Sequence, residues 1–61
     1  MTPARFKSIR HGTGLSQRAM ARYLGIGFRT LQRYESGEYD IPRTLELLMT
    51  AIEAGSVSIT G

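Results

Sequence analysis

The three residues Gly25-Ile26-Gly27 constrain this chain more than any other feature of its sequence. They separate two short segments in which apolar residues recur three or four positions apart, as on one face of an α-helix. These residues are Met20, Ala21 and Leu24 in the first segment and Phe28, Leu31 and Tyr34 in the second. A connection this short makes two helices cross steeply instead of running side by side. Residues 17–24 and 28–36 are therefore predicted to form a pair of crossed helices.

Two more helices are predicted on either side of this pair. A helix over residues 3–11 is favoured by Thr2-Pro3, because the threonine hydroxyl can cap it and the fixed φ of proline suits its first position. Another is expected to begin at Pro42 and to run up to Gly55. Its apolar stripe consists of Leu45, Leu48, Met49 and Ile52.

The predicted fold class is all-α, a small bundle of four helices, or of four to five elements, over residues 1–55. The tail, residues 56–61, alternates polar and apolar side chains, which suits a strand, but a single strand has no partner within this chain. Two alternatives stay open from the sequence. The tail pairs with a second copy of the protein, or it is a frayed end.

Size and composition exclude several classes of protein. The chain has 61 residues and no cysteine, so it can form one small domain without disulfides or a thiolate zinc site. Its single histidine, His11, has no spaced histidine or carboxylate partners. No serine stands with a base, and no carboxylate pair marks a cleft, so we expect a protein that is not an enzyme and holds no cofactor or metal.

The charges are strongly divided along the chain. Residues 1–34 contain seven cationic side chains and no acidic one: Arg5, Lys7, Arg10, Arg18, Arg22, Arg29 and Arg33. Residues 35–61 contain five acidic side chains and a single arginine, Arg43. A basic half without counter-charges is a candidate surface for a polyanion, although a solvated basic face would have the same composition.

No segment is apolar enough to suggest a membrane span or a secretory signal. The longest uninterrupted apolar run is Leu47-Leu48-Met49, far shorter than the roughly 20 residues that cross a bilayer. We therefore expect a cytoplasmic protein that does not bind a membrane.

The crossed pair satisfies the requirements of a helix-turn-helix. This unit needs a small residue where its helices touch, a glycine at the turn and apolar residues on the inner faces, so that the outer face of its second helix stays free. Ala21 and Gly25 take the first two places. The inner faces are supplied by Met20, Leu24, Ile26, Leu31 and Tyr34.

This pattern resembles the helix-turn-helix domain of the phage repressor and Cro family, also called the Xre family. The blocks that carry the resemblance are Phe6-x-x-Ile9-Arg10, Gly14-Leu15-Ser16-Gln17, Ala21-x-x-Leu24-Gly25, Thr30-Leu31-Gln32-Arg33-Tyr34-Glu35-Ser36-Gly37 and Ile41-Pro42. The resemblance implies a repressor-like bundle whose third helix lies in the major groove of double-stranded DNA.

The resemblance also implies roles for single residues. Ser16 and Gln17 would hold a phosphate and brace the third helix. Arg43 would reach the DNA backbone or the adjacent minor groove. Arg10 and Glu35 would form an internal ion pair, so that Arg10 would contribute little to DNA attraction.

The base-reading residues would be Phe28, Arg29 and Arg33. Arginine can offer two donors to guanine, and Phe28 suits a thymine methyl group, although it could also fold back into the core. Gln32 and Arg33 lie one turn further along the outer face of the same helix. The sequence leaves open which of these side chains contacts a base and which a phosphate.

Three departures from the family pattern are present. Gly27 stands where serine or threonine usually caps the third helix. Glu38 and Asp40 stand where basic residues often meet the DNA backbone, so they either weaken nonspecific affinity or turn this loop away from phosphate. No counterpart of the usual fifth helix is predicted, so a dimer contact would have to come from elsewhere, with the tail as the candidate.

The leading hypothesis is a sequence-specific, double-stranded DNA-binding transcriptional regulator, a prokaryotic or phage repressor that acts as a homodimer on two half-sites about 10 base pairs apart. The alternative is a protein-interaction module, such as the antitoxin of a toxin-antitoxin pair, whose acidic half binds a basic protein.

Overall fold

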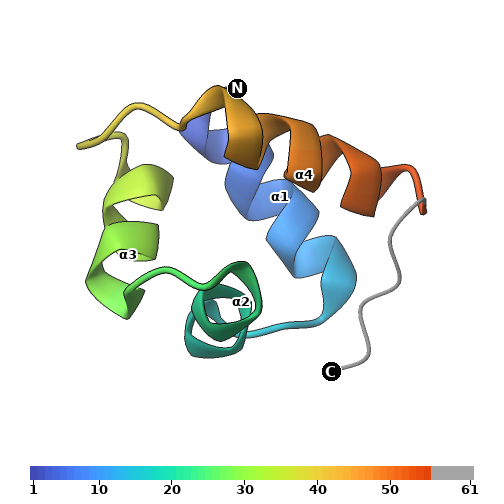
Figure 1. The fold of residues 1–61 in the computed structure, drawn as a ribbon, viewed down its shortest axis with the longest axis horizontal. Coiled ribbons are helices and arrows are strands. Elements are labelled where there is room, and N and C mark those ends of the chain that lie inside the picture. Colours follow the sequence, from blue (N-terminus) through green and yellow to red (C-terminus); the bar gives the residue numbers. More distant parts are fainter. Residues whose placement is uncertain (56–61) are drawn as a thin grey trace.

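A computed structural model describes residues 1–55 and shows four α-helices within that range (Figure 1). They are α1 (Pro3–Thr13), α2 (Gln17–Leu24), α3 (Phe28–Ser36) and α4 (Arg43–Glu53). The prediction of an all-α, four-helix fold is therefore confirmed. The strand considered for residues 56–61 lies outside the described residues.

Capping residues hold the ends of the first three helices, among them the predicted cap Thr2. The Thr2 hydroxyl accepts a hydrogen bond from the Arg5 amide at 3.1 Å, and the Ser16 hydroxyl accepts one from the Ala19 amide at 3.1 Å. Gly37 ends α3 with a φ of 85°, a conformation that is strained for any residue with a side chain.

Helix α1 is two residues longer than predicted, because Gly14, and not Gly12, ends it with a φ of 79°. Thr13 explains the choice between the two glycines. Its hydroxyl donates a hydrogen bond to the Arg10 carbonyl at 2.6 Å and accepts one from the Leu15 amide at 3.2 Å. These two bonds hold the last turn of α1 and lead the chain towards α2.

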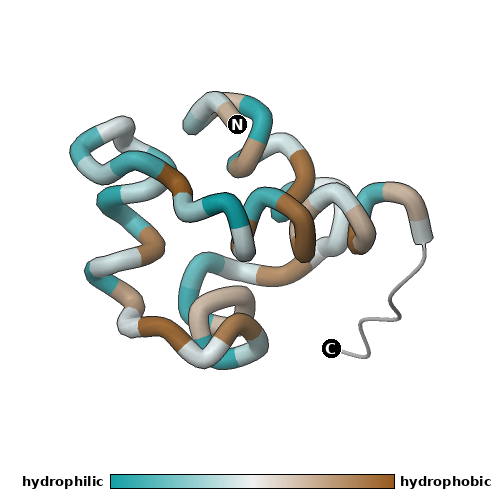
Figure 2. The backbone as a smooth tube through the Cα atoms, turned by 45° about the horizontal axis from the view of Figure 1, so that its top comes forward, coloured by the Kyte–Doolittle hydropathy of each residue, from teal (hydrophilic) through white to brown (hydrophobic). Residues whose placement is uncertain are grey.

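Each helix contributes one fully buried side chain to a single core. These four are Phe6 of α1, Met20 of α2, Leu31 of α3 and Met49 of α4, all with no exposed surface. Ile9, Ala21 and Ile52 complete the buried cluster. Figure 2 shows hydrophobic stretches alternating with hydrophilic ones along the chain. This is the pattern of helices that each bury one face.

The arrangement of the helices leaves one side of α3 uncovered. Helix α1 packs against both α3 and α4, while α2 packs against α3 across the short connection (Figure 1). Leu31 therefore points into the core, and the opposite side of α3 faces solvent. Within residues 1–55 there is no helix that is both long and apolar enough to cross a membrane.

Candidate nucleic-acid interface

The turn between α2 and α3 is built as the glycine spacing predicts. Gly25 ends α2 with a φ of 72°, and the Ile26 amide donates to the Ala21 carbonyl at 3.0 Å. The Ala21 side chain is buried, and the Ile26 side chain packs against the core. Gly27 then begins α3 without a side-chain cap. The turn thereby holds α3 across α2 with a defined side outward.

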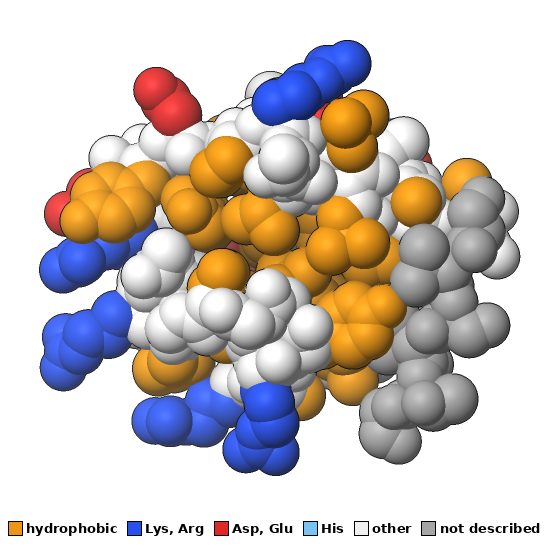
Figure 3. Space-filling model, in the orientation of Figure 1, with side chains coloured by type: hydrophobic (Ala, Val, Ile, Leu, Met, Phe, Trp, Pro, Cys, Tyr) orange, Lys and Arg blue, Asp and Glu red, His pale blue; other side chains and the backbone are white. Residues whose placement is uncertain are grey.

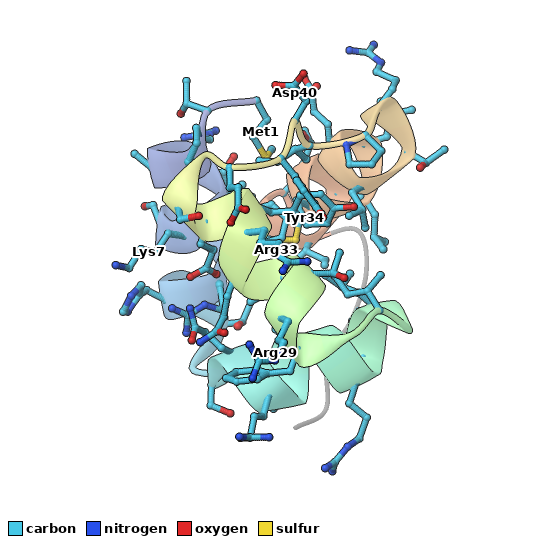
Figure 4. All side chains as sticks on the ribbon, turned by 90° about the vertical axis from the view of Figure 1, so that its left-hand side faces the viewer. Met1, Lys7, Arg29, Arg33, Tyr34 and Asp40 are labelled. Carbon is cyan, nitrogen blue, oxygen red and sulfur yellow. The ribbon has the colours of Figure 1, made fainter. Side chains whose placement is uncertain are left out.

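The outward side of α3 presents polar and cationic side chains. Arg29 and Gln32 are exposed, and the Arg33 side chain is 41% exposed. Figure 4 looks onto this side, with Arg29 and Arg33 following one another along the helix. A shallow depression of about 290 Å³ lies beside it. Its lining consists of Arg29, Gln32, Arg33, Ser36 and Glu38.

Cationic side chains extend this surface from α3 onto α2. Figure 3 shows Lys and Arg side chains projecting along the two edges of the molecule formed by α3 and α2. Arg18 and Arg22 of α2 are exposed, as is Arg29 of α3. Arg5 of α1 forms an ion pair with Glu53 of α4, which partly neutralises its charge. It therefore adds little to the cationic surface of α2 and α3.

Phe28 lies outside the hydrophobic core, so the alternative in which it folds back into the core is wrong. It is half-buried, and the Arg18 guanidinium carbon lies 4.1 Å from the centre of its ring. An arginine in this position is attracted by the negative face of the ring. Sequence reasoning missed this contact with Arg18, because helical periodicity does not show that the first turns of α2 and α3 meet.

The internal ion pair between Arg10 and Glu35 is present. The Arg10 Nε atom lies 2.6 Å from Glu35 Oε2, and its Nη2 atom donates to Glu35 Oε1 at 3.2 Å. The two side chains are only 9% and 4% exposed. A further bond of 3.0 Å runs from Arg10 Nη1 to the Leu15 carbonyl. Arg10 thus joins α1 to α3 and to the start of α2.

Gln17 connects this buried pair to the outer side of α3. Its Nε2 atom donates to Glu35 Oε1 at 3.0 Å, and its Oε1 atom accepts from Gln32 Nε2 at 3.5 Å. Both ends of the Gln17 amide therefore contact α3, which is the geometry expected of a bracing residue. Ser16 lies beside it, exposed, with its hydroxyl already bound to the Ala19 amide.

Arg33 and Arg43 both have acidic neighbours. Arg33 lies against Glu38 and Tyr39 of the loop that follows α3. Arg43, in the first turn of α4, is 75% exposed, and its Nη1 atom is 3.6 Å from Glu46 Oε1. Among the predicted contact residues, Gln17 contacts Gln32, and Arg29, Gln32 and Arg33 line one depression. Arg43 alone comes from a separate element.

A family model described as a helix-turn-helix domain matches residues 4–58. The chain belongs to the helix-turn-helix domain family. The match includes nearly all of α1 and the whole of the other three helices. Helix-turn-helix domains bind DNA through the second helix of the crossed pair, which is α3 in this domain. No curated protein and no solved structure matches the chain.

The helix-turn-helix domain has no apparent metal centre in its described part. Within residues 1–55, no three His, Asp or Glu side chains are grouped closely enough to hold a metal ion. The geometry supports contact with a polyanion through the outer side of α3.

Proposed function

We propose that this helix-turn-helix domain is a sequence-specific transcriptional regulator of the repressor and Cro class, which inserts α3 into the major groove of double-stranded DNA. The observation that carries the proposal is the division of α3 into two sides. Leu31 has no exposed surface, whereas Arg29 and Gln32 are exposed on the opposite side. A helix anchored in this way can enter the groove without loss of core contacts.

In the proposed complex, Arg29 and Arg33 contact base edges, with guanine as the expected base for a bidentate arginine. Phe28, held under Arg18, contacts a thymine methyl group. Gln32 lies between the two arginines in sequence and contacts either a base or a phosphate.

Backbone contacts set the register of the complex. Ser16 and Gln17 are proposed to meet a phosphate at the start of α2, where the free amide groups of the helix also attract an anion. Gln17 is held by Glu35 and Gln32, so it approaches the phosphate in a fixed orientation. Arg43 extends from the start of α4 towards the DNA backbone or the adjacent minor groove.

We propose that two copies bind half-sites about one helical turn apart, because one small domain buries limited surface on DNA. Residues 56–61 are the proposed dimer contact, and residues 1–55 are the proposed DNA-binding domain. A chain truncated after Gly55 should sediment as a monomer while the full chain sediments as a dimer. A monomeric full chain would contradict this part of the proposal. No contact within residues 1–55 favours the alternative of an antitoxin.

The test of DNA recognition is selection from random duplexes, followed by affinity measurements at several salt concentrations. We expect a preferred sequence whose binding weakens as salt rises, because the protein releases counterions from the phosphates. Arg29→Ala should relax the preference at one base position by about 1–3 kcal/mol. The control is Lys7→Ala, which removes the same charge from an exposed residue of α1. Absence of any preferred sequence would refute the proposal.

A further inference from the structure

Two residues of the loop between α3 and α4 contact Arg33 on different sides of its guanidinium group. Glu38 Oε2 lies 3.6 Å from Arg33 Nε, and Arg33 Nη1 donates to the Tyr39 hydroxyl at 3.1 Å. The guanidinium carbon also lies 5.2 Å from the centre of the Tyr39 ring. We call Arg33, Glu38 and Tyr39 the Arg33 clasp.

The clasp is anchored to the body of the domain. The Tyr39 amide donates to the Arg33 carbonyl at 3.2 Å, which closes the loop back onto α3. The Tyr39 ring lies edge-on to Tyr34 at 6.3 Å, and Tyr34 in turn lies 6.2 Å from the buried ring of Phe6. Tyr39 is 44% exposed, but its ring contact with Tyr34 and its amide bond to α3 place its hydroxyl beside Arg33.

The clasp leaves part of the guanidinium group available. Arginine has five N–H donors. The clasp uses one donor on Nη1 for the Tyr39 hydroxyl, and Glu38 lies beside Nε at ion-pair distance. The second Nη1 donor and both Nη2 donors are unused by Glu38 and Tyr39. Guanine presents two neutral acceptors, O6 and N7, which match a pair of such donors. A clasped Arg33 can therefore still make a bidentate contact with guanine.

A DNA phosphate is a poorer partner for the clasped arginine. It carries a negative charge, so it is repelled by the Glu38 carboxylate and must compete with that carboxylate for Arg33. A guanine edge carries no net charge and avoids this competition. Repulsion of a competing ligand is a known source of specificity, and here the Glu38 carboxylate would repel the phosphate.

We propose that Glu38 and Tyr39 are positioning residues that reserve Arg33 for a base edge and keep it from binding phosphates. This inference rests on the proposed function, since it assumes that α3 enters the major groove. It assigns a role to an acidic residue that would otherwise only weaken DNA binding. Without the carboxylate, Arg33 gains a phosphate contact that is the same for every sequence.

The test compares Glu38→Gln with Asp40→Asn. Both variants remove one negative charge from the same exposed loop, but only Glu38 contacts Arg33. Figure 4 shows Asp40 beyond the end of α3, well separated from Arg33. The ligands are the selected duplex and a scrambled duplex of the same length, with binding measured by fluorescence anisotropy over a range of salt concentrations.

We expect Glu38→Gln to lower the ratio of specific to nonspecific affinity by up to about fivefold, the upper end of the effect of one exposed ion pair. Its nonspecific binding should also gain about one unit of salt slope, as expected for one additional phosphate contact. Asp40→Asn should raise both affinities together and leave the ratio unchanged. Tyr39→Phe, which removes only the hydroxyl, should lower the ratio by a smaller factor than Glu38→Gln.

The outcomes separate this inference from the proposed function. Equal affinity ratios and equal salt slopes for the two charge variants, with the wild-type preference intact, would overturn the clasp alone. A wild-type chain without any sequence preference would overturn the proposed function and the clasp with it. A second measurement needs no DNA: the NMR signal of the Arg33 Nε–H group should shift in Glu38→Gln and stay in place in Asp40→Asn, because only Glu38 lies beside that group.

Discussion

Arg10→Ala is the substitution whose effect the structure defines most closely. It removes both guanidinium contacts to Glu35, at 2.6 and 3.2 Å, and leaves a carboxylate whose side chain is 4% exposed. One hydrogen bond, from Gln17 Nε2 at 3.0 Å, still reaches Glu35. The variant therefore retains a buried acidic group with one partner in place of two.

Removing one partner of a buried ion pair costs about 3–5 kcal/mol of the free energy of unfolding. The remaining bond from Gln17 places the expected loss near the lower end, at about 3 kcal/mol. In a domain of about 60 residues, each kcal/mol lowers Tm by about 4–8 °C, so the expected fall is about 12–24 °C. The matched control is Arg5→Ala, on the same helix, which breaks an ion pair whose side chains are 55% and 40% exposed. That control should cost no more than about 1 kcal/mol.

The assay is thermal unfolding followed by far-UV circular dichroism, with DNA affinity measured well below the Tm of each variant. Arg10→Ala should lose far more stability than DNA affinity, because Arg10 acts inside the domain. The double variant Arg10→Met, Glu35→Leu should be more stable than Arg10→Ala, because no charge is left without a partner. A Tm for Arg10→Ala equal to that of Arg5→Ala would refute the reasoning.

The remaining predictions concern the start of α3. Gly27→Ser should raise the free energy of unfolding by about 0.5–1 kcal/mol in urea unfolding, because it adds a helix cap and restricts the unfolded chain. Gly27→Asp should stabilise the domain similarly but weaken DNA binding, because it adds a negative charge at the start of α3. Equal DNA affinities for Gly27→Ser and Gly27→Asp would contradict a DNA contact at the start of α3. Leu31→Ala should lower the free energy of unfolding by about 2–5 kcal/mol, and Phe28→Ala should lower it less. Phe28→Ala should nevertheless weaken specific DNA binding more than nonspecific binding. Equal losses of Tm for the two variants would contradict the position of Phe28 outside the core.

The fold follows from local signals that are visible in the sequence. Apolar residues at helical spacing mark the buried faces, and glycines with left-handed backbone mark the helix ends. Helix ends were less predictable: Gly12 and Gly14 are both stop signals for α1, and α4 begins at Arg43, one residue after the predicted Pro42. The end of α1 depends on the Thr13 hydroxyl, which bonds to the Arg10 carbonyl and the Leu15 amide. The spacing of apolar residues and glycines does not reveal this contact.

The candidate site was less predictable than the fold. Helical periodicity indicates which side of α3 faces outward, but it does not show what lies across from each side chain. Two contacts were missed for this reason: Arg18 over the Phe28 ring, and Glu38 beside Arg33. From the sequence, Glu38 and Asp40 were equivalent acidic residues of one loop. Only the folded chain distinguishes them, because Glu38 alone contacts Arg33.

The four fully buried side chains, one from each helix, have a consequence for how the domain responds to its ligand. If one helix detaches, its buried side chain leaves the core and the other three helices lose contacts. The domain is therefore expected to unfold cooperatively. DNA bound on α3 should therefore slow hydrogen exchange at the most protected amides of α4 by the same factor as in α3, although α4 supplies little of the DNA contact. DNA bound mainly through α3 would thus stabilise all four helices against unfolding to the same extent.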